Sequence, residues 1–147
     1  MKIETIFYLS TIVFLMMELG WLVAPVEKTK KANKYFELTK VFKDKEWKDF
    51  SEEYKSLTLS FIWYLWGFLW LLIGLFTVQW TGFLIILLFN ILIIGPLSKI
   101  TRFTISYTIL HWINSLIGFL FGVFIIINHY HLRIDLTEWV MVFLKLN

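Results

Sequence analysis

The sequence predicts an all-α integral membrane protein, with four transmembrane helices arranged as a bundle. Of its 147 residues, 59% are hydrophobic and only 17% are charged, whereas about 25% of the residues in an average soluble domain are charged. Two long stretches, residues 56–98 and 103–132, contain no Asp, Glu, Lys or Arg. A helix needs about 20 apolar residues to cross the hydrocarbon core of a membrane. The first stretch is therefore long enough for two crossings and the second for one.

The fourth crossing comes from the apolar N-terminal segment. In chain order, a single domain of residues 1–147 is expected to hold transmembrane helices at residues 3–24, 57–78, 80–97 and 103–128. The first should end before Pro25, because proline commonly follows a helix end. It is interpreted as a retained helix and not as a signal peptide, because its apolar stretch is too long and no small-residue cleavage motif follows. The short segment VQWTG predicts a tight hairpin between the second and third helices, and Gly95-Pro96 is expected to break the third.

Lysine and arginine are unequally distributed between the two sides of the predicted membrane domain. The loop of residues 25–56 holds nine lysines, and the loop after the third helix adds Lys99 and Arg102. The opposite side has three basic residues, which are Lys2, Arg133 and Lys145. Because basic loops remain in the cytoplasm, we expect both termini outside and the long loop inside. A bacterial inner membrane is the expected location, and an organellar membrane is the alternative.

The cytoplasmic loop has two parts with helical patterns. Residues 27–43 interleave lysines with apolar and aromatic residues, which is typical of an amphipathic helix lying on an anionic lipid surface with its apolar face inserted. The expected contacts with anionic lipids are Lys28, Lys30, Lys31 and Lys34. Ser51, followed by two glutamates, resembles a helix N-cap, so the second transmembrane helix should begin several turns before the membrane. The whole loop carries a net charge of only +2, which argues against a nucleic-acid partner.

The C-terminal tail, residues 132–147, is too short for a fifth crossing. Thr137 or Asp135 is a candidate N-cap for a short helix that places Trp139 and Phe143 in the outer membrane interface. Docking to a partner protein is an equal alternative for this segment. The alternating pattern of LRIDLT also permits a strand, which ranks lower.

One carboxylate interrupts an apolar run, FLMMELGW (residues 14–21). A charged group inside a membrane is costly and usually faces the bundle interior beside a partner. At about 1.5 Å per residue, Glu18 lies about 12 Å from the inner boundary of its helix. Each of the other three helices has a polar side chain at about the same level. Those residues are Tyr64, Asn90 and His111, and Asn114 and Ser115 follow His111 one turn further in. The predicted polar layer therefore consists of Glu18, Tyr64, Asn90, His111, Asn114 and Ser115.

The polar layer has two main interpretations. A Glu18–His111 pair is suited to exchanging a proton or holding a cation, which predicts a small proton- or cation-coupled transporter that works as a dimer. Alternatively, a neutral Glu18 donates a hydrogen bond to His111 or Asn90 and joins the helices, a contact worth about 0.6–2 kcal/mol. Partial hydration of Glu18 near the inner interface is a further alternative.

Small residues predict close helix packing on two of the helices. The segment SLIGFLFG presents Ser115, Gly118 and Gly122 on one face of the fourth helix. Gly67 and Gly74 share a face of the second helix and are candidate partners for that face within the chain. The fourth-helix face contacts either another helix of this chain or another protein. We expect a non-catalytic subunit of a larger membrane assembly, which binds other membrane proteins, a second copy of itself and lipids. The transporter is the alternative function.

No catalytic or metal-binding signature occurs in the sequence. The chain has no cysteine and three histidines, and it lacks the usual nucleotide-binding, hydrolase and zinc-protease motifs. His129 and His131 are two residues apart and therefore do not share a helix face. We expect no enzymatic activity, no metal and no cofactor.

Two segments resemble a known family. FYLSTIVFLMMEL (residues 7–19) and GFLFGVFIIIN (residues 118–128) are similar to the first and fourth helices of the small multidrug resistance transporters. That family also has four helices, with a membrane-embedded glutamate in the first and a glycine-bearing face in the fourth. The remaining chain departs from the family, which lacks a long lysine-rich loop. The resemblance implies a proton- or cation-binding role for Glu18.

Overall fold

The computed structural model describes residues 3–144, and within this range the chain forms helices and turns without a strand. Four helices are long and apolar enough to cross a membrane: Glu4–Val23, Glu52–Gly74, Trp80–Ile100 and Ile105–Leu132. The predicted all-α class and the four candidate membrane spans are thereby confirmed. Residues 145–147 of the predicted tail, including Lys145, and Lys2 lie outside the described range.

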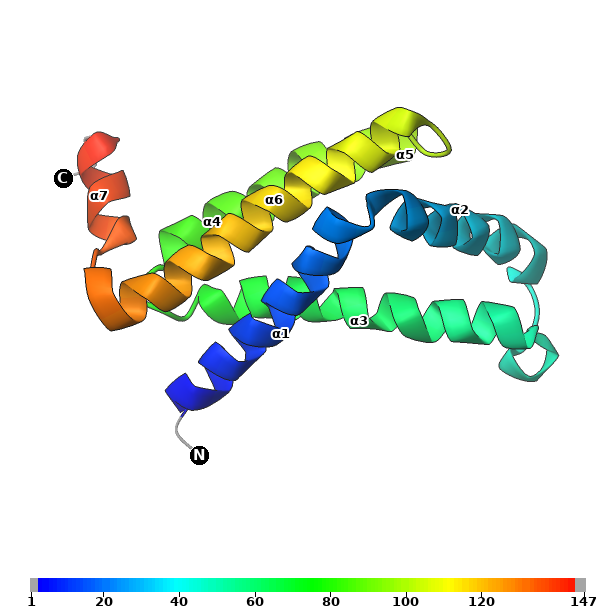
Figure 1. Cartoon of the computed structure of the whole chain (residues 1–147), viewed down its shortest axis with the longest axis horizontal. Coiled ribbons are helices and arrows are strands. Elements are labelled where there is room, and N and C mark those ends of the chain that lie inside the picture. Colours follow the sequence, from blue (N-terminus) through cyan, green and yellow to red (C-terminus); the bar gives the residue numbers. More distant parts are fainter. Residues whose placement is uncertain (1–2, 145–147) are drawn as a thin grey trace.

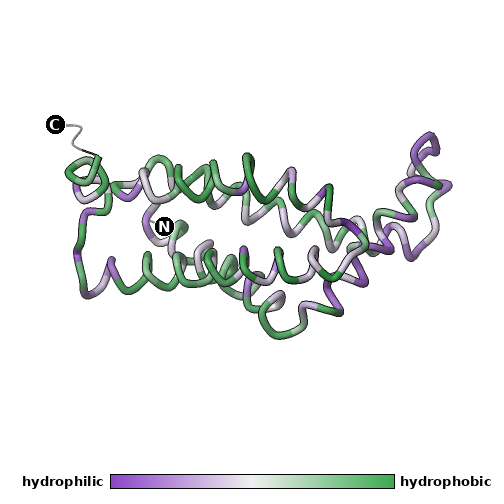
Figure 2. The backbone as a smooth tube through the Cα atoms, turned by 90° about the horizontal axis from the view of Figure 1, so that it is seen from above, coloured by the Kyte–Doolittle hydropathy of each residue, from purple (hydrophilic) through white to green (hydrophobic). Residues whose placement is uncertain are grey.

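The helices form a bundle with a hydrophilic extension at one end. The elements are α1 (Ile3–Val23), α2 (Pro25–Phe42), a 3-10 turn (Trp47–Asp49), α3 (Glu52–Gly74), α4 (Trp80–Phe89), a π-helical segment (Asn90–Ile94), α5 (Gly95–Ile100), α6 (Ile105–Ile127), a second π-helical segment (Asn128–Leu132) and α7 (Leu136–Phe143). In Figure 1, α1 and α4 run in one direction, and α3 and α6 run in the other. The turn between α2 and α3 lies at the hydrophilic end of the molecule in Figure 2.

Local sequence determines several helix ends. Pro25 occupies the first turn of α2, where a missing N–H does not remove a helical hydrogen bond. The Ser51 hydroxyl caps α3 by accepting a hydrogen bond from the Tyr54 N–H at 3.2 Å, as predicted. Asp135 caps α7 by accepting hydrogen bonds from the N–H groups of Thr137 and Glu138 at 2.9 and 3.1 Å. Residues 133–135 form neither a helix nor a strand, and the capped helix begins at Leu136, so the strand alternative for this segment is wrong.

The third membrane helix is not broken at Gly95-Pro96, which corrects the sequence prediction. The helix continues to Ile100, with a π-helical turn immediately before the proline. In this turn the Gly95 N–H donates to the Asn90 carbonyl, five residues earlier. A wider turn makes room for the Pro96 ring, which would otherwise clash with the preceding turn. The irregularity therefore lies at Asn90 and not at the proline.

The fourth membrane helix is longer than predicted, because a second π-helical segment extends it from Ile127 to Leu132. The buried amide of Asn128 then holds the chain reversal: its Oδ1 accepts from the Ile134 N–H at 2.7 Å, and its Nδ2 donates to the Ile134 carbonyl at 2.8 Å. Gln79, in the turn between α3 and α4, donates to the same carbonyl at 2.7 Å. These two amides attach the start of α7 to the α3–α4 turn.

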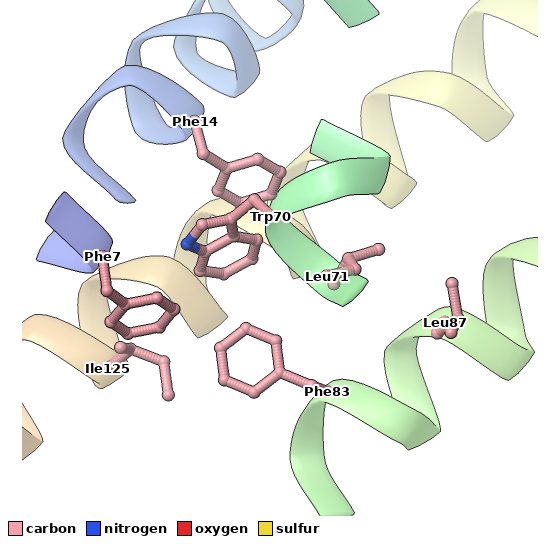
Figure 3. Packing of buried hydrophobic residues seen from close by; sticks show 7 residues of the cluster. All are labelled: Phe7, Phe14, Trp70, Leu71, Phe83, Leu87 and Ile125. Atoms are coloured by element: carbon pink, nitrogen blue, oxygen red, sulfur yellow. The ribbon is translucent and has the colours of Figure 1, made fainter. Parts of the chain in front are cut away.

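An aromatic core joins α1, α3, α4 and α6, and Figure 3 shows its side chains. At its centre the Trp70 side chain is only 1% exposed. Its indole stacks on Phe14 with ring centroids 4.0 Å apart, and the Phe83 ring meets it edge-on at 4.9 Å. The indole Nε1 donates to the Thr11 hydroxyl at 2.8 Å. This hydrogen bond satisfies the polar atom that a buried tryptophan carries.

The glycine face of α6 packs within the chain. A Cβ atom at Gly122 would lie 2.7 Å from Leu15 Cδ2, and one at Gly118 would lie 3.2 Å from Phe14 Cζ. Both glycines therefore permit close approach of α1. This arrangement decides between the two alternatives for this face, since α1 covers it and leaves no room there for another protein. Gly67 and Gly74 of α3 contact Phe14 and Phe83, not the α6 glycines.

The predicted amphipathic helix exists as α2, but its aromatic face packs against the rest of the chain. The Tyr35 ring stacks on Phe61 of α3 with centroids 4.4 Å apart. The Phe36 ring meets Tyr107 of α6 edge-on at 6.3 Å, and the Arg102 guanidinium lies 3.9 Å above the Phe36 ring. These two rings therefore pack within the chain while staying partly exposed, and insertion of the apolar face of α2 into lipid stays a prediction.

Candidate functional site

A cavity of about 200 Å³ lies between α1, α3, α4 and α6. All six residues of the predicted polar layer line it: Glu18, Tyr64, Asn90, His111, Asn114 and Ser115. The remaining wall is formed by Phe14, Trp21, Gly67, Phe68, Leu71, Ile86 and Gly118. The structure thus brings together the polar side chains that were predicted to form one layer.

Helical spacing explains why these side chains meet. On α1 the lining residues are Phe14, Glu18 and Trp21, which are four and three residues apart. The lining residues of α3 and α6 follow the same spacing, beginning at Tyr64 and at His111. Residues at such intervals project from one face of a helix over two turns. The cavity therefore extends along two turns of each of these three helices.

The Glu18 carboxyl is positioned against the small-residue face of α6. Its carboxyl carbon lies 3.4 Å from where a Cβ atom at Gly118 would be, so the missing side chain makes the space that the carboxyl occupies. Ser115, one turn before Gly118, lines the same cavity as the carboxyl. Among the described residues, Glu18 forms no ion pair.

His111 does not pair with Glu18, which corrects the predicted contact. The imidazole stacks on Trp21 with ring centroids 5.2 Å apart, and it contacts the Tyr107 ring at 4.2 Å. Its Nε2 is buried and has no hydrogen-bond partner within residues 3–144. The indole of Trp21, one turn beyond Glu18 on the same helix, provides the flat surface that holds the imidazole. The two titratable side chains therefore share the cavity without a direct hydrogen bond.

The hydrogen bond that crosses the polar layer joins two amides and not Glu18. The Asn114 Nδ2 donates to Asn90 Oδ1 at 3.0 Å, and the Asn90 Nδ2 donates to the Ile86 carbonyl at 2.9 Å. The predicted structural role of the layer is therefore carried by Asn90 and Asn114. Because Asn90 begins the π-helical segment, this contact also links α6 to the irregular turn of the third membrane helix.

The chemistry of the cavity suits a small cation. It offers one carboxyl group and amide and hydroxyl oxygens, and the rings of Trp21 and Tyr64 form part of its wall. Within the described chain, no group of three or more His, Cys, Asp or Glu side chains comes close enough to hold a metal ion. Sequence reasoning missed the two rings of α1, Phe14 and Trp21, although their distances of four and three residues from Glu18 place them on its face.

The other predicted site residues lie outside this cavity. Lys28 and Lys31 line a groove between α1, α2 and α3, and Lys30 and Lys34 line an adjoining hollow between α2 and α3. Gly74 and Gly122 lie in the helix contacts described above. His129 contacts the Tyr8 ring with centroids 4.1 Å apart.

Comparison with known proteins gave no relative: no protein-family model, curated protein or solved structure matches this chain. Its function is therefore inferred from its own residues and their geometry.

Proposed function

We propose that this protein is a small membrane carrier that binds a proton or a small cation at Glu18. The observation that carries this proposal is a carboxyl group that faces a cavity between four candidate membrane helices and has no basic partner in the described chain. An uncompensated carboxyl at this depth is costly. A cation or a proton in the cavity removes that cost by neutralising the group.

The cavity restricts the ligand to a small one. A volume of about 200 Å³ accommodates a hydronium ion, an alkali-metal ion or a small ammonium ion such as methylammonium. The Tyr64 ring in the wall favours an ammonium ion, because desolvated cation–π contacts contribute about 2 kcal/mol. The buried, unpaired Nε2 of His111 supplies a further hydrogen-bonding group at the wall. A dimer remains the proposed working form.

The proposed orientation has both termini outside and the lysine-rich α2 inside, in a bacterial inner membrane. The lysine and arginine distribution supports it. The fold is consistent with it, because the start of α1 and α7 lie toward the same end of the bundle (Figure 1). An external reagent that reacts with cysteine should then label a Glu138→Cys variant in intact cells and leave a Lys34→Cys variant unlabelled.

The Glu18→Gln variant tests the carrier proposal. We expect the wild-type protein in lipid nanodiscs to bind methylammonium or Na⁺, and the variant to bind the same probe at least tenfold more weakly, because the amide cannot become negatively charged. Proteoliposomes with a pH-sensitive dye inside extend the measurement to proton movement. The control is Glu4→Gln, an exposed carboxyl on the same helix, which should retain wild-type binding.

Two outcomes would overturn the carrier. One is unchanged binding and proton movement in Glu18→Gln, and the other is a wild-type protein that neither binds these probes nor moves protons. Infrared difference spectroscopy on the wild type adds a direct readout, because a cation that binds at Glu18 must change the carboxyl stretching band, and the change must be absent from the variant.

The second candidate function is a non-catalytic subunit that binds other membrane proteins, and α7 favours it. Trp139 and Phe143 of this helix are 71% and 86% exposed. Exposed apolar surface of this kind marks an interface with protein or membrane. Because α1 covers the α6 glycine face, α7 replaces that face as the proposed contact with a partner.

Native mass spectrometry tests the subunit proposal on protein purified from its own membrane in mild detergent. We expect a second protein in fixed stoichiometry with the wild type, and its loss from a Trp139→Ser, Phe143→Ser double variant. An Ile100→Ser variant, which also removes a highly exposed apolar side chain but near the far end of the bundle, should keep the partner. A wild-type protein that purifies without a second protein contradicts this function.

A further inference from the structure

A second cavity, of about 250 Å³, lies between α1, α2 and α3 and shares Tyr64 with the cavity at Glu18. The inference drawn from it does not rest on the function proposed for Glu18. Its walls differ in chemistry. Lys28, Lys31 and Ser60 form a polar part. Met16, Met17 and Trp63 form an apolar part on the membrane helices. The cavity thus has the amphipathic character of a lipid: one region suits a charged group, and the other suits hydrocarbon.

The polar part continues as a groove between α2 and α3. An adjoining hollow is lined by Lys30, Lys34 and Ser56, and Lys31 lines both spaces. On α3, Ser56 and Ser60 are four residues apart and therefore face the same side. An ion pair between Lys34 and Glu53 marks the end of the groove that is farther from α1. Basic side chains from α2 thus oppose hydroxyl groups from α3 along its length.

Lys28 is a basic side chain of the groove without a carboxylate partner in the described chain. Its side chain folds back over α1, with the ammonium Nζ 3.5 Å from where a Cβ atom at Gly20 would be. Gly20 leaves the space in which this side chain lies. Lys31 pairs with Glu27 at 3.1 Å and Lys34 pairs with Glu53, whereas Lys28 has no carboxylate partner within residues 3–144. The ammonium group of Lys28, which is only partly exposed, is therefore available to an anion in the groove.

We infer that this groove binds one anionic phospholipid, with the phosphate held by Lys28, Lys31 and Ser60. The acyl chains then lie along Met16, Met17 and Trp63, at the level of the membrane helices. Charge complementarity supports this occupant, because Lys28, at the α1 end, offers positive charge that no carboxylate of the described chain neutralises, and Lys31 adds a second ammonium group beside it. The position of the groove also supports a phospholipid. Its polar part lies at the junction of α1 and α2, where a membrane helix meets a basic helix.

Lipid adducts in native mass spectra of the full-length protein test this inference. The probe is dioleoyl phosphatidylglycerol, with dioleoyl phosphatidylcholine as the uncharged comparison. We expect the wild type to retain phosphatidylglycerol preferentially, and a Lys28→Gln, Lys31→Gln double variant to need at least tenfold more of it for the same adduct fraction. The matched control, Lys43→Gln, Lys45→Gln, removes the same charge outside the groove and should behave as the wild type.

A second variant keeps the charge and changes the shape. Gly20→Leu fills the space in which the Lys28 side chain lies and so displaces it. We therefore expect the same loss of bound phosphatidylglycerol although both lysines are present. Equal retention by the lysine double variant and its control would overturn the site. Displacement of the lipid by inorganic phosphate at equal concentration would also overturn it, because it would reduce the site to a simple anion site. None of these outcomes depends on Glu18, so this inference and the carrier proposal fail or stand separately.

Discussion

Replacing Trp70 with alanine is expected to lower the free energy of unfolding by about 3–5 kcal/mol, the range for removing a large buried side chain. The indole is almost fully buried and stacks on Phe14, and it contacts Phe83 edge-on. Between membrane helices, packing contacts and hydrogen bonds provide much of the association energy. Loss of this side chain leaves a cavity where α1, α3, α4 and α6 meet.

Two further variants separate packing from hydrogen bonding at this position. Trp70→Phe keeps a ring in the core but removes the hydrogen bond to Thr11, so it should cost about 1 kcal/mol. Phe76→Ala removes an aromatic side chain that is 93% exposed and should have little effect. Unfolding in mixed detergent micelles, followed by circular dichroism, provides the three values. If Trp70→Ala and Phe76→Ala proved equally mild, the aromatic core would not stabilise the bundle.

Replacing Gly74 with alanine is expected to destabilise the bundle by about 1–3 kcal/mol, the usual range for overpacking. The added methyl group would overlap the ring of Phe83, whose side chain is 0% exposed. That ring has little freedom to move, because the rings of Trp70 and Phe121 each lie 4.9 Å from it. The strain must therefore be relieved by displacing α4 from α3.

Gly67 provides the matched control, because the same substitution on the same helix should have the opposite sign. A Cβ atom there would lie 3.5 Å from the Phe14 ring, which is an ordinary contact. Alanine in a helix interior is favoured over glycine by about 0.5–1 kcal/mol. The free energy of unfolding is measured for both variants in the same way. A change of equal sign and size at the two positions would contradict the close Gly74–Phe83 contact.

The helix ends show what could be read locally. The Ser51 cap of α3, the Asp135 cap of α7 and the end of α1 before Pro25 follow from side chains a few residues away. Pro96 shows the limit of such reading. Whether a proline ends a helix or is accommodated by a π-helical turn depends on the backbone path before it, and that path is not encoded in the Gly-Pro pair.

In the candidate site, too, some features could be predicted from the sequence and others depend on the tertiary structure. Glu18 was identified because it interrupts an apolar run, and depth counting then selected Tyr64, Asn90 and His111, because helical rise is constant and each helix has few polar residues. Asn114 and Ser115 were added as the next polar residues after His111. Depth counting did not identify which of these residues touch. Asn90 bonds to Asn114, while His111 stacks on Trp21. Rotation of each helix about its axis decides these pairs, and the packing of neighbouring helices sets that rotation.

The sequence by itself determined the all-α class, the four candidate membrane spans and the amphipathic helix that follows the first. These features depend on apolar length, charge spacing and caps, which act over a few turns of one helix. Only the tertiary structure decided that α1 covers the α6 glycines, that the α2 rings pack on α3 and α6, and that Lys28 lies over Gly20. Such contacts join residues far apart in the chain, so they depend on how complementary side-chain shapes fit when the helices come together.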